Sequence, residues 1–179
     1  MTLRAGSRLL LASLLGAACQ GAADPAEDSA QGSLTVEWSG SQRGVFTGPA
    51  EARWCPTDTV LEIIAARSDT GVGLALFATD SAGTTDFPVS PAYLFVPWRP
   101  QAGAALRWLG ATEVLAFDGS SGRITIARSA GGRVSGRVEA MLRIVSRQGP
   151  DSIRLTGGFQ DVRVRPAALP CGRTNRPGG

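Results

Sequence analysis

The ionisable side chains of this sequence allow only a narrow range of chemistry, because the chain contains no histidine. Histidine is the commonest general base near neutral pH and the commonest ligand of transition metals, so Ser-His-Asp and Cys-His mechanisms are excluded within the chain. Two carboxylates facing one cleft could still support a hydrolase. The glutamates are scattered along the sequence and fall mostly on expected solvent faces: Glu37, Glu51, Glu62, Glu113 and Glu139. We therefore expect no catalytic residue and predict that the chain is not an enzyme.

Aromatic and arginine side chains gather in one stretch and make the best candidate for a ligand-binding site. Aromatic faces beside guanidinium groups can bind a sugar, a lipid or an aromatic compound. The alternative is that the aromatic rings fill a hydrophobic core. The candidate residues are Tyr93, Trp98, Trp108, Arg99 and Arg107.

Loop aspartates suggest a calcium site only superficially. The segment 80–86 (DSAGTTD) offers several oxygen ligands in a turn, but it lacks the spacing of a calcium-binding loop and the terminal glutamate. Aspartate in a turn ordinarily bonds its own backbone. We expect no metal and no cofactor.

Charge gives a second candidate surface. The formal net charge of +3 includes Arg4 and Arg8 of an N-terminal segment, so the remainder is close to neutral and nucleic-acid binding is not expected. A stripe of Arg133, Arg137 and Arg143, interrupted by a single acid, could contact anionic headgroups or an acidic partner. The alternative is a solvated face that discourages aggregation at a strand edge.

The N-terminal segment has the features of an export signal. Two arginines precede the short apolar run Leu9–Leu15, which is too short to span a bilayer. The following residues, Leu15-Gly16-Ala17-Ala18-Cys19, resemble the lipobox of bacterial lipoproteins, in which a cysteine after small residues is acylated and becomes the new N-terminus. Gly16 stands where leucine is usual in that motif. The alternative is cleavage after residues 21–23 (GAA), which would give a secreted protein that begins at Asp24.

The lipobox resemblance implies a membrane anchor at Cys19. With Gln20 rather than aspartate in the next position, it also implies sorting to the outer membrane on its periplasmic side. We expect a signal peptide over 1–18, a lipidated cysteine and flexible tether over 19–32, one domain over 33–171, and a flexible tail over 172–179. With Cys19 acylated, Cys55 and Cys171 remain, and in an oxidising compartment the pair is expected to form a disulfide.

The hydrophobic pattern of the remaining sequence has a period of two, which predicts strands. Leu34, Val36 and Trp38 alternate with polar residues, and residues 45–54 form an extended segment with a bulge or edge position at Gly48 and Pro49. Residues 114–117 and 123–127 are expected to form a hairpin around a turn at 118–122.

Two long strands are expected at the end of the domain. Apolar residues alternate over 133–144 and again from Ile153 to Phe159, after which the apolar set slips by one position to Val162. A slip of one residue would turn side chains to the wrong face, so we predict a bulge between Gly157 and Asp161.

Together these patterns predict an all-β fold, an antiparallel sandwich or partly open barrel of about nine or ten strands. We expect a non-catalytic envelope lipoprotein that acts as a protein-interaction or structural domain. The alternative functions are binding of a small ligand and, less favoured, a carboxylate-dependent hydrolase. The expected partners are the membrane, through the anchor, and an envelope protein; the sequence leaves the oligomeric state open.

Overall fold

The computed structural model describes residues 32–77, 85–91, 94, 99–110, 112–129 and 131–167, and most of these residues lie in strands. The described strands are β1 (Gly32–Gly40), β2 (Gly44–Cys55), β3 (Val60–Arg67), β4 (Thr70–Phe77), β5 (Asp86–Pro88), β6 (Gln101–Leu109), β7 (Val114–Ser129), β8 (Arg133–Ile144) and β9 (Ser152–Pro166). The prediction of an all-β fold with little helix is confirmed.

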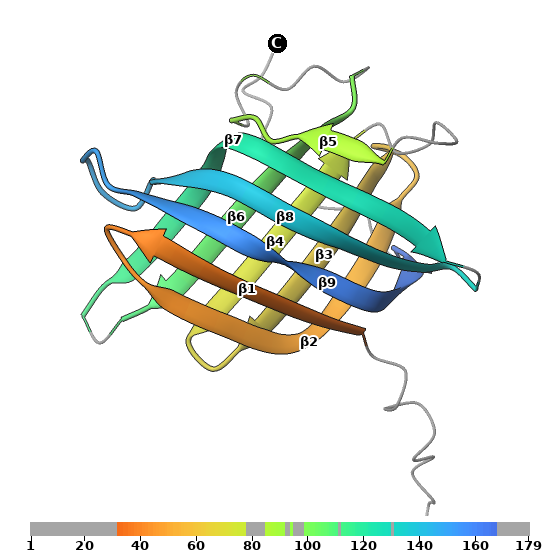
Figure 1. The fold of residues 1–179 in the computed structure, drawn as a ribbon, viewed down its shortest axis with the longest axis horizontal. Coiled ribbons are helices and arrows are strands. Elements are labelled where there is room, and N and C mark those ends of the chain that lie inside the picture. Colours follow the sequence, from red (N-terminus) through yellow and green to blue (C-terminus); the bar gives the residue numbers. More distant parts are fainter. Residues whose placement is uncertain are drawn as a thin grey trace, which may run out of the picture.

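Eight of these strands close into a barrel (Figure 1). Each strand pairs with the next in the order β7-β6-β4-β3-β2-β1-β9-β8, and β8 pairs with β7 to complete the ring. The short strand β5 pairs with the far half of β7, where Phe87 lies opposite Ile124. Of the sandwich and the barrel that the sequence left open, the structure has the barrel.

The barrel has two different ends. The turns between β1 and β2, β3 and β4, β6 and β7, and β8 and β9 lie at one end, which we call the turn end. The opposite end holds the start of β1 at Gly32 and the end of β9 at Pro166, and we call it the terminal end. Beyond Gly32, β2 and β9 pair directly and in parallel, with Ala52 opposite Val164.

Alternation of apolar and polar residues explains the interior. In β1 the buried side chains are those of Leu34, Val36 and Trp38, and the polar residues between them are exposed. The same alternation in the other strands places apolar side chains inside the ring, where they form one continuous core. Among the residues that the structure describes, Gln101 is the only polar one classed as buried.

The predicted hairpin around residues 118–122 is wrong. β7 runs without a break from Val114 to Ser129. The reason is that β8 pairs with β7 over nearly its whole length, from Phe117 opposite Ile144 to Ser129 opposite Arg133. The turn-like residues are accommodated as a local irregularity between Gly119 and Ser121.

The predicted bulge in the last strand is confirmed. Phe159 pairs with Gly136 and Val162 pairs with Val134, so two residues of β9 lie opposite one residue of β8. Asp161 has a φ of 52°, and its backbone N–H donates to the Ser135 hydroxyl at 2.9 Å. The bulge returns Val162 to the core, where its side chain is fully buried.

At Gly48 and Pro49 the pairing with β1 continues in register, so this position has no bulge. It is instead an edge on one side, because β2 pairs with β3 only from Glu51 to Cys55. The missing N–H of Pro49 therefore leaves no ladder bond unmade on that side. The Arg67 guanidinium spans the gap and donates to the Thr47 carbonyl oxygen at 3.3 Å.

Aromatic rings occupy the space that glycines leave inside the wall. A Cβ built on Gly136 would overlap the Phe159 ring, and one built on Gly44 would overlap the Trp38 ring. The glycines thus let large rings lie flat against the strands, which packs the interior closely at these points.

This packing predicts the effect of Gly136→Ala. The added methyl group would collide with the Thr125 carbonyl oxygen as well as the Phe159 ring, so we expect the free energy of unfolding to fall by about 1–3 kcal/mol. Equilibrium unfolding in urea measures the change. The matched control is Gly73→Ala, whose Cβ meets nothing within 4 Å and which should cost nothing. An equal loss in both variants would contradict the packing argument.

Candidate functional site

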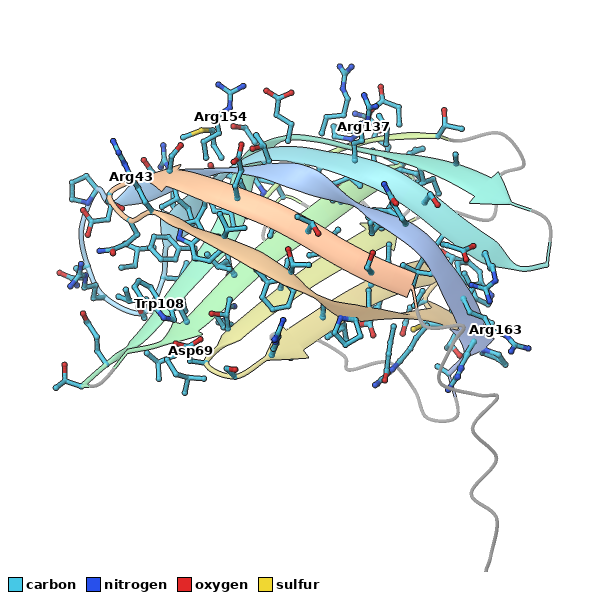
Figure 2. All side chains as sticks on the ribbon, turned by 60° about the horizontal axis from the view of Figure 1, so that its bottom comes forward. Arg43, Asp69, Trp108, Arg137, Arg154 and Arg163 are labelled. Carbon is cyan, nitrogen blue, oxygen red and sulfur yellow. The ribbon has the colours of Figure 1, made fainter. Side chains whose placement is uncertain are left out.

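The structure does not bring the described members of the predicted ligand site together. Arg107 and Trp108 are neighbours on β6 and face opposite sides of the wall, while Arg99 precedes β6 at the terminal end. Trp108 lies at the turn end (Figure 2). Tyr93 and Trp98 lie outside the described residues.

Arg107 joins two neighbouring strands on the outer surface. Its guanidinium donates to the Phe117 carbonyl oxygen at 2.8 Å and pairs with the Asp118 carboxylate at 2.7 Å. Both partners belong to β7, so Arg107 holds β6 and β7 together and has a structural role.

Trp108 takes part in a polar cluster at the turn end. Its indole Nε1–H donates to the Asp69 carboxylate at 3.2 Å, and the Thr70 hydroxyl donates to the other carboxylate oxygen at 2.9 Å. The Leu109 N–H donates to the Asp69 carbonyl oxygen at 2.8 Å. The hydrogen bonds from Thr70 and then Trp108 favour the ionised carboxylate and lower the pKa of Asp69. This cluster ties the β3–β4 turn to the end of β6.

Trp38 also lies at the turn end, but on the inside of the barrel. Its side chain is buried, and its indole Nε1 is the one buried side-chain polar atom without a hydrogen-bond partner in the described part of the chain. A buried donor without a partner is costly, so this atom marks a position where an acceptor would be stabilised.

The acids and the cysteine do not converge in the described structure. Glu62, which interrupts an apolar strand, faces outward from β3 and lies opposite Arg53 of β2. No group of three or more acids and cysteines that could hold a metal ion occurs within the described ranges. Cys55 is buried at the end of β2, and Cys171 lies outside the described residues, so their pairing remains a prediction. The segment 80–86 also lies largely outside them.

The predicted arginine stripe is on the outer face of β8, and β9 extends it. Arg137 and Arg143 are exposed, and neither makes an ion pair with a described residue. Arg133 pairs with Asp161 at 2.8 Å, and Glu139 pairs with Arg154 of β9. Figure 2 shows Arg137 and Arg154 projecting from this face.

A denser group of arginines, which the sequence analysis missed, lies at the terminal end. Arg165 of β9 is next to Arg53 of β2 in the parallel pairing, and Arg163 is opposite Arg133 of β8. We call these four residues the terminal arginine cluster. Figure 2 shows Arg163 at the end of the barrel opposite Trp108 and Asp69. The sequence signal was the alternation VRVRP over residues 162–166, but the neighbouring arginines come from distant strands.

Acids balance only the flanks of this cluster. Glu51 lies 3.4 Å from Arg53, and Asp161 lies 2.8 Å from Arg133. Arg163 and Arg165 on the central strand are exposed and make no ion pair with a described residue; Asp58 lies on the nearby β2–β3 turn. The central strand thus presents two guanidinium groups to solvent or to a partner.

Comparison with protein-family models, with curated proteins and with solved structures finds no match. In the part of the chain that the structure describes, no helix is long and apolar enough to cross a membrane.

The Asp69 cluster predicts a pH-dependent effect of Trp108→Phe, which removes the indole donor and keeps a ring. A carboxyl with a lowered folded pKa stabilises the fold above its unfolded pKa of about 4, and this stabilisation is lost as the pH falls through the folded pKa. We therefore expect the variant to be less stable than the wild type at neutral pH and the difference to shrink in acid. Urea unfolding at several pH values measures it.

The control for this prediction is Trp54→Phe at the terminal end, where the ring packs against the core. Its stability difference from the wild type should not depend on the ionisation of Asp69. A Trp108→Phe difference that is the same at neutral and acidic pH would show that the indole bond does not stabilise the carboxylate.

Proposed function

We propose that this protein is an exported lipoprotein, anchored through Cys19, whose barrel acts as a non-catalytic interaction domain through its outer surface. The observation that carries the proposal is the contrast between the two faces of the wall. The described interior is a continuous apolar core, and none of the charged side chains that the structure describes is buried.

The packing of the interior supports a surface function. Phe117 and Phe159 are among the largest fully buried side chains, and the rings of Phe159 and Trp38 fill the space beside glycines. An eight-stranded barrel is just wide enough for side chains to fill it or to hold one small ligand. Aromatic rings pressed against the wall favour the filled state.

The chemistry of the outer surface favours an acidic partner. Arg137 and Arg143 lie six residues apart on the outer face of β8, with Glu139 and Met141 between them, and their exposed guanidinium groups make no ion pair with a described acid. Guanidinium groups bind carboxylates in a bidentate geometry, which gives both specificity and strength. The anchor would supply the second part of the function by holding this surface at the membrane.

A second function, carriage of a small ligand, is favoured by one observation. The unpartnered Nε1 of Trp38 is a donor inside the barrel that could bind the acceptor group of a ligand. Such a ligand would have to displace core packing at the turn end.

Native mass spectrometry of the protein extracted from its own membranes in mild detergent tests both functions. We expect a chain that begins at an acylated Cys19 and carries no small molecule, and we expect Cys19→Ser to lose both the acyl mass and the membrane fraction. A processed chain that begins near Asp24 without lipid would contradict the anchor. A stoichiometric small-molecule adduct would favour ligand carriage.

We also propose the Cys55–Cys171 disulfide. The Ala167 N–H donates to the Trp54 carbonyl oxygen at 2.9 Å, which brings the chain four residues before Cys171 to the neighbour of Cys55. A bond between them would close a loop of more than a hundred residues, which stabilises the fold by about 4–5 kcal/mol in the chain-entropy model.

The disulfide predicts that Cys55→Ala and Cys171→Ser lower the unfolding temperature. The same bond is removed in each single variant and in the double variant. The double variant should therefore lose no more stability than the bond and the buried Cys55 side chain contribute together. Reduction of the wild type should reproduce the Cys171→Ser value. Thermal unfolding measures the change, and quantitative labelling of the wild type by a thiol reagent in denaturant would contradict the bond.

A further inference from the structure

The terminal arginine cluster lies beside the point where the chain enters the barrel. A Cβ built on Gly32, the first residue of β1, would lie 2.5 Å from the Val162 Cα atom. Val162 directly precedes Arg163 on β9. The segment that joins Cys19 to the barrel therefore attaches on the arginine-bearing side of the terminal end.

The cluster places like charges on neighbouring strands. Like charges placed directly opposite each other on neighbouring strands destabilise a sheet. Here Arg165 adjoins Arg53, and Arg163 is opposite Arg133, while the two described ion pairs involve only the flanking arginines. The bulge at Asp161 keeps Arg163 and Arg165 on the outer face. On one exposed strand, these two guanidinium groups make no ion pair with a described residue, and guanidinium groups suit the geometry of phosphate groups.

We infer that the terminal arginine cluster binds the phosphate groups of an anionic bilayer surface. This binding orients the barrel with its terminal end facing the bilayer. This inference rests on the proposed lipid anchor. The twelve residues between Cys19 and Gly32 reach at most about 40 Å when extended, so an anchored barrel stays within reach of the headgroups. Because the tether attaches beside the cluster, the cluster can reach the headgroups without the tether having to pass along the barrel. The turn end, with Trp108 and Asp69, then faces away from the membrane.

The test uses the full acylated protein in vesicles of phosphatidylcholine alone and in vesicles that also contain phosphatidylglycerol. Arginines are modified with phenylglyoxal, and peptide mass spectrometry gives the modification rate at each position. We expect Arg163 and Arg165 to react several-fold more slowly in the anionic vesicles, and high salt to remove the protection because it screens exposed charges. Arg137 and Arg143, exposed on β8, are internal controls that should react equally in both.

A matched pair of variants completes the test. Arg163→Gln with Arg165→Gln should abolish the protection that anionic vesicles give to Arg53, whereas Arg137→Gln with Arg143→Gln should leave it unchanged. Equal reaction of Arg163 and Arg165 in both vesicles would overturn the inference. Protection by inorganic phosphate in neutral vesicles to the same extent would assign the cluster to a soluble anion. Protection only on addition of an acidic protein would assign it to a protein partner.

Flotation with neutral vesicles distinguishes a failure of the proposed anchor from a failure of the arginine cluster to bind. An acylated chain floats with neutral vesicles, whatever the cluster binds. A chain without an acyl group would not, and the proposed function would then have failed. The cluster would still be tested by flotation of that chain with anionic vesicles at low salt, where we expect binding and where its absence would overturn the inference.

Discussion

The pairing of β7 with β8 is the constraint on which the rest of this structure depends. It joins the two ends of one long antiparallel sheet and so removes the free edges that an open sheet would expose. Closure also separates the two faces of every strand into an interior and an exterior. An apolar interior filled by side chains from opposite walls then follows from simple alternation along each strand. Most of the polar side chains that the structure describes are left to the outer surface.

Local irregularities in this regular wall determine where charges lie. The bulge at Asp161 turns Val162 back into the core and leaves Arg163 and Arg165 outside. β1 begins at Gly32, so it does not separate β2 from β9 beyond that point. There β2 pairs directly with β9, which places Arg53 next to Arg165. Neither feature alone would concentrate positive charge. Together they form a basic region at the end of the barrel where the chain enters it.

Much of this fold could be predicted from the sequence, because most strands carry an alternating pattern and the last hairpin is local. The bulge was predictable since a slip in the apolar pattern has only one solution in a sheet with a buried face. The continuity of β7 through Asp118 and Gly122 was not, because it depends on pairing with β8 along its whole length. The terminal arginine cluster was missed because it joins residues from β2, β8 and β9, and the direct β2–β9 pairing is visible only in the closed barrel. Arg107 and Trp108 were grouped by sequence proximity, although neighbours on a strand face opposite sides.

We propose that the interior is filled and that the outer surface carries the function. The most direct test is a fluorescence titration of the native protein with N-phenyl-1-naphthylamine, an apolar probe that becomes bright in a dry cavity. We expect no saturable binding to the folded barrel. Saturable one-to-one binding that Trp38→Phe weakens would contradict the claim and would show that the barrel carries a ligand.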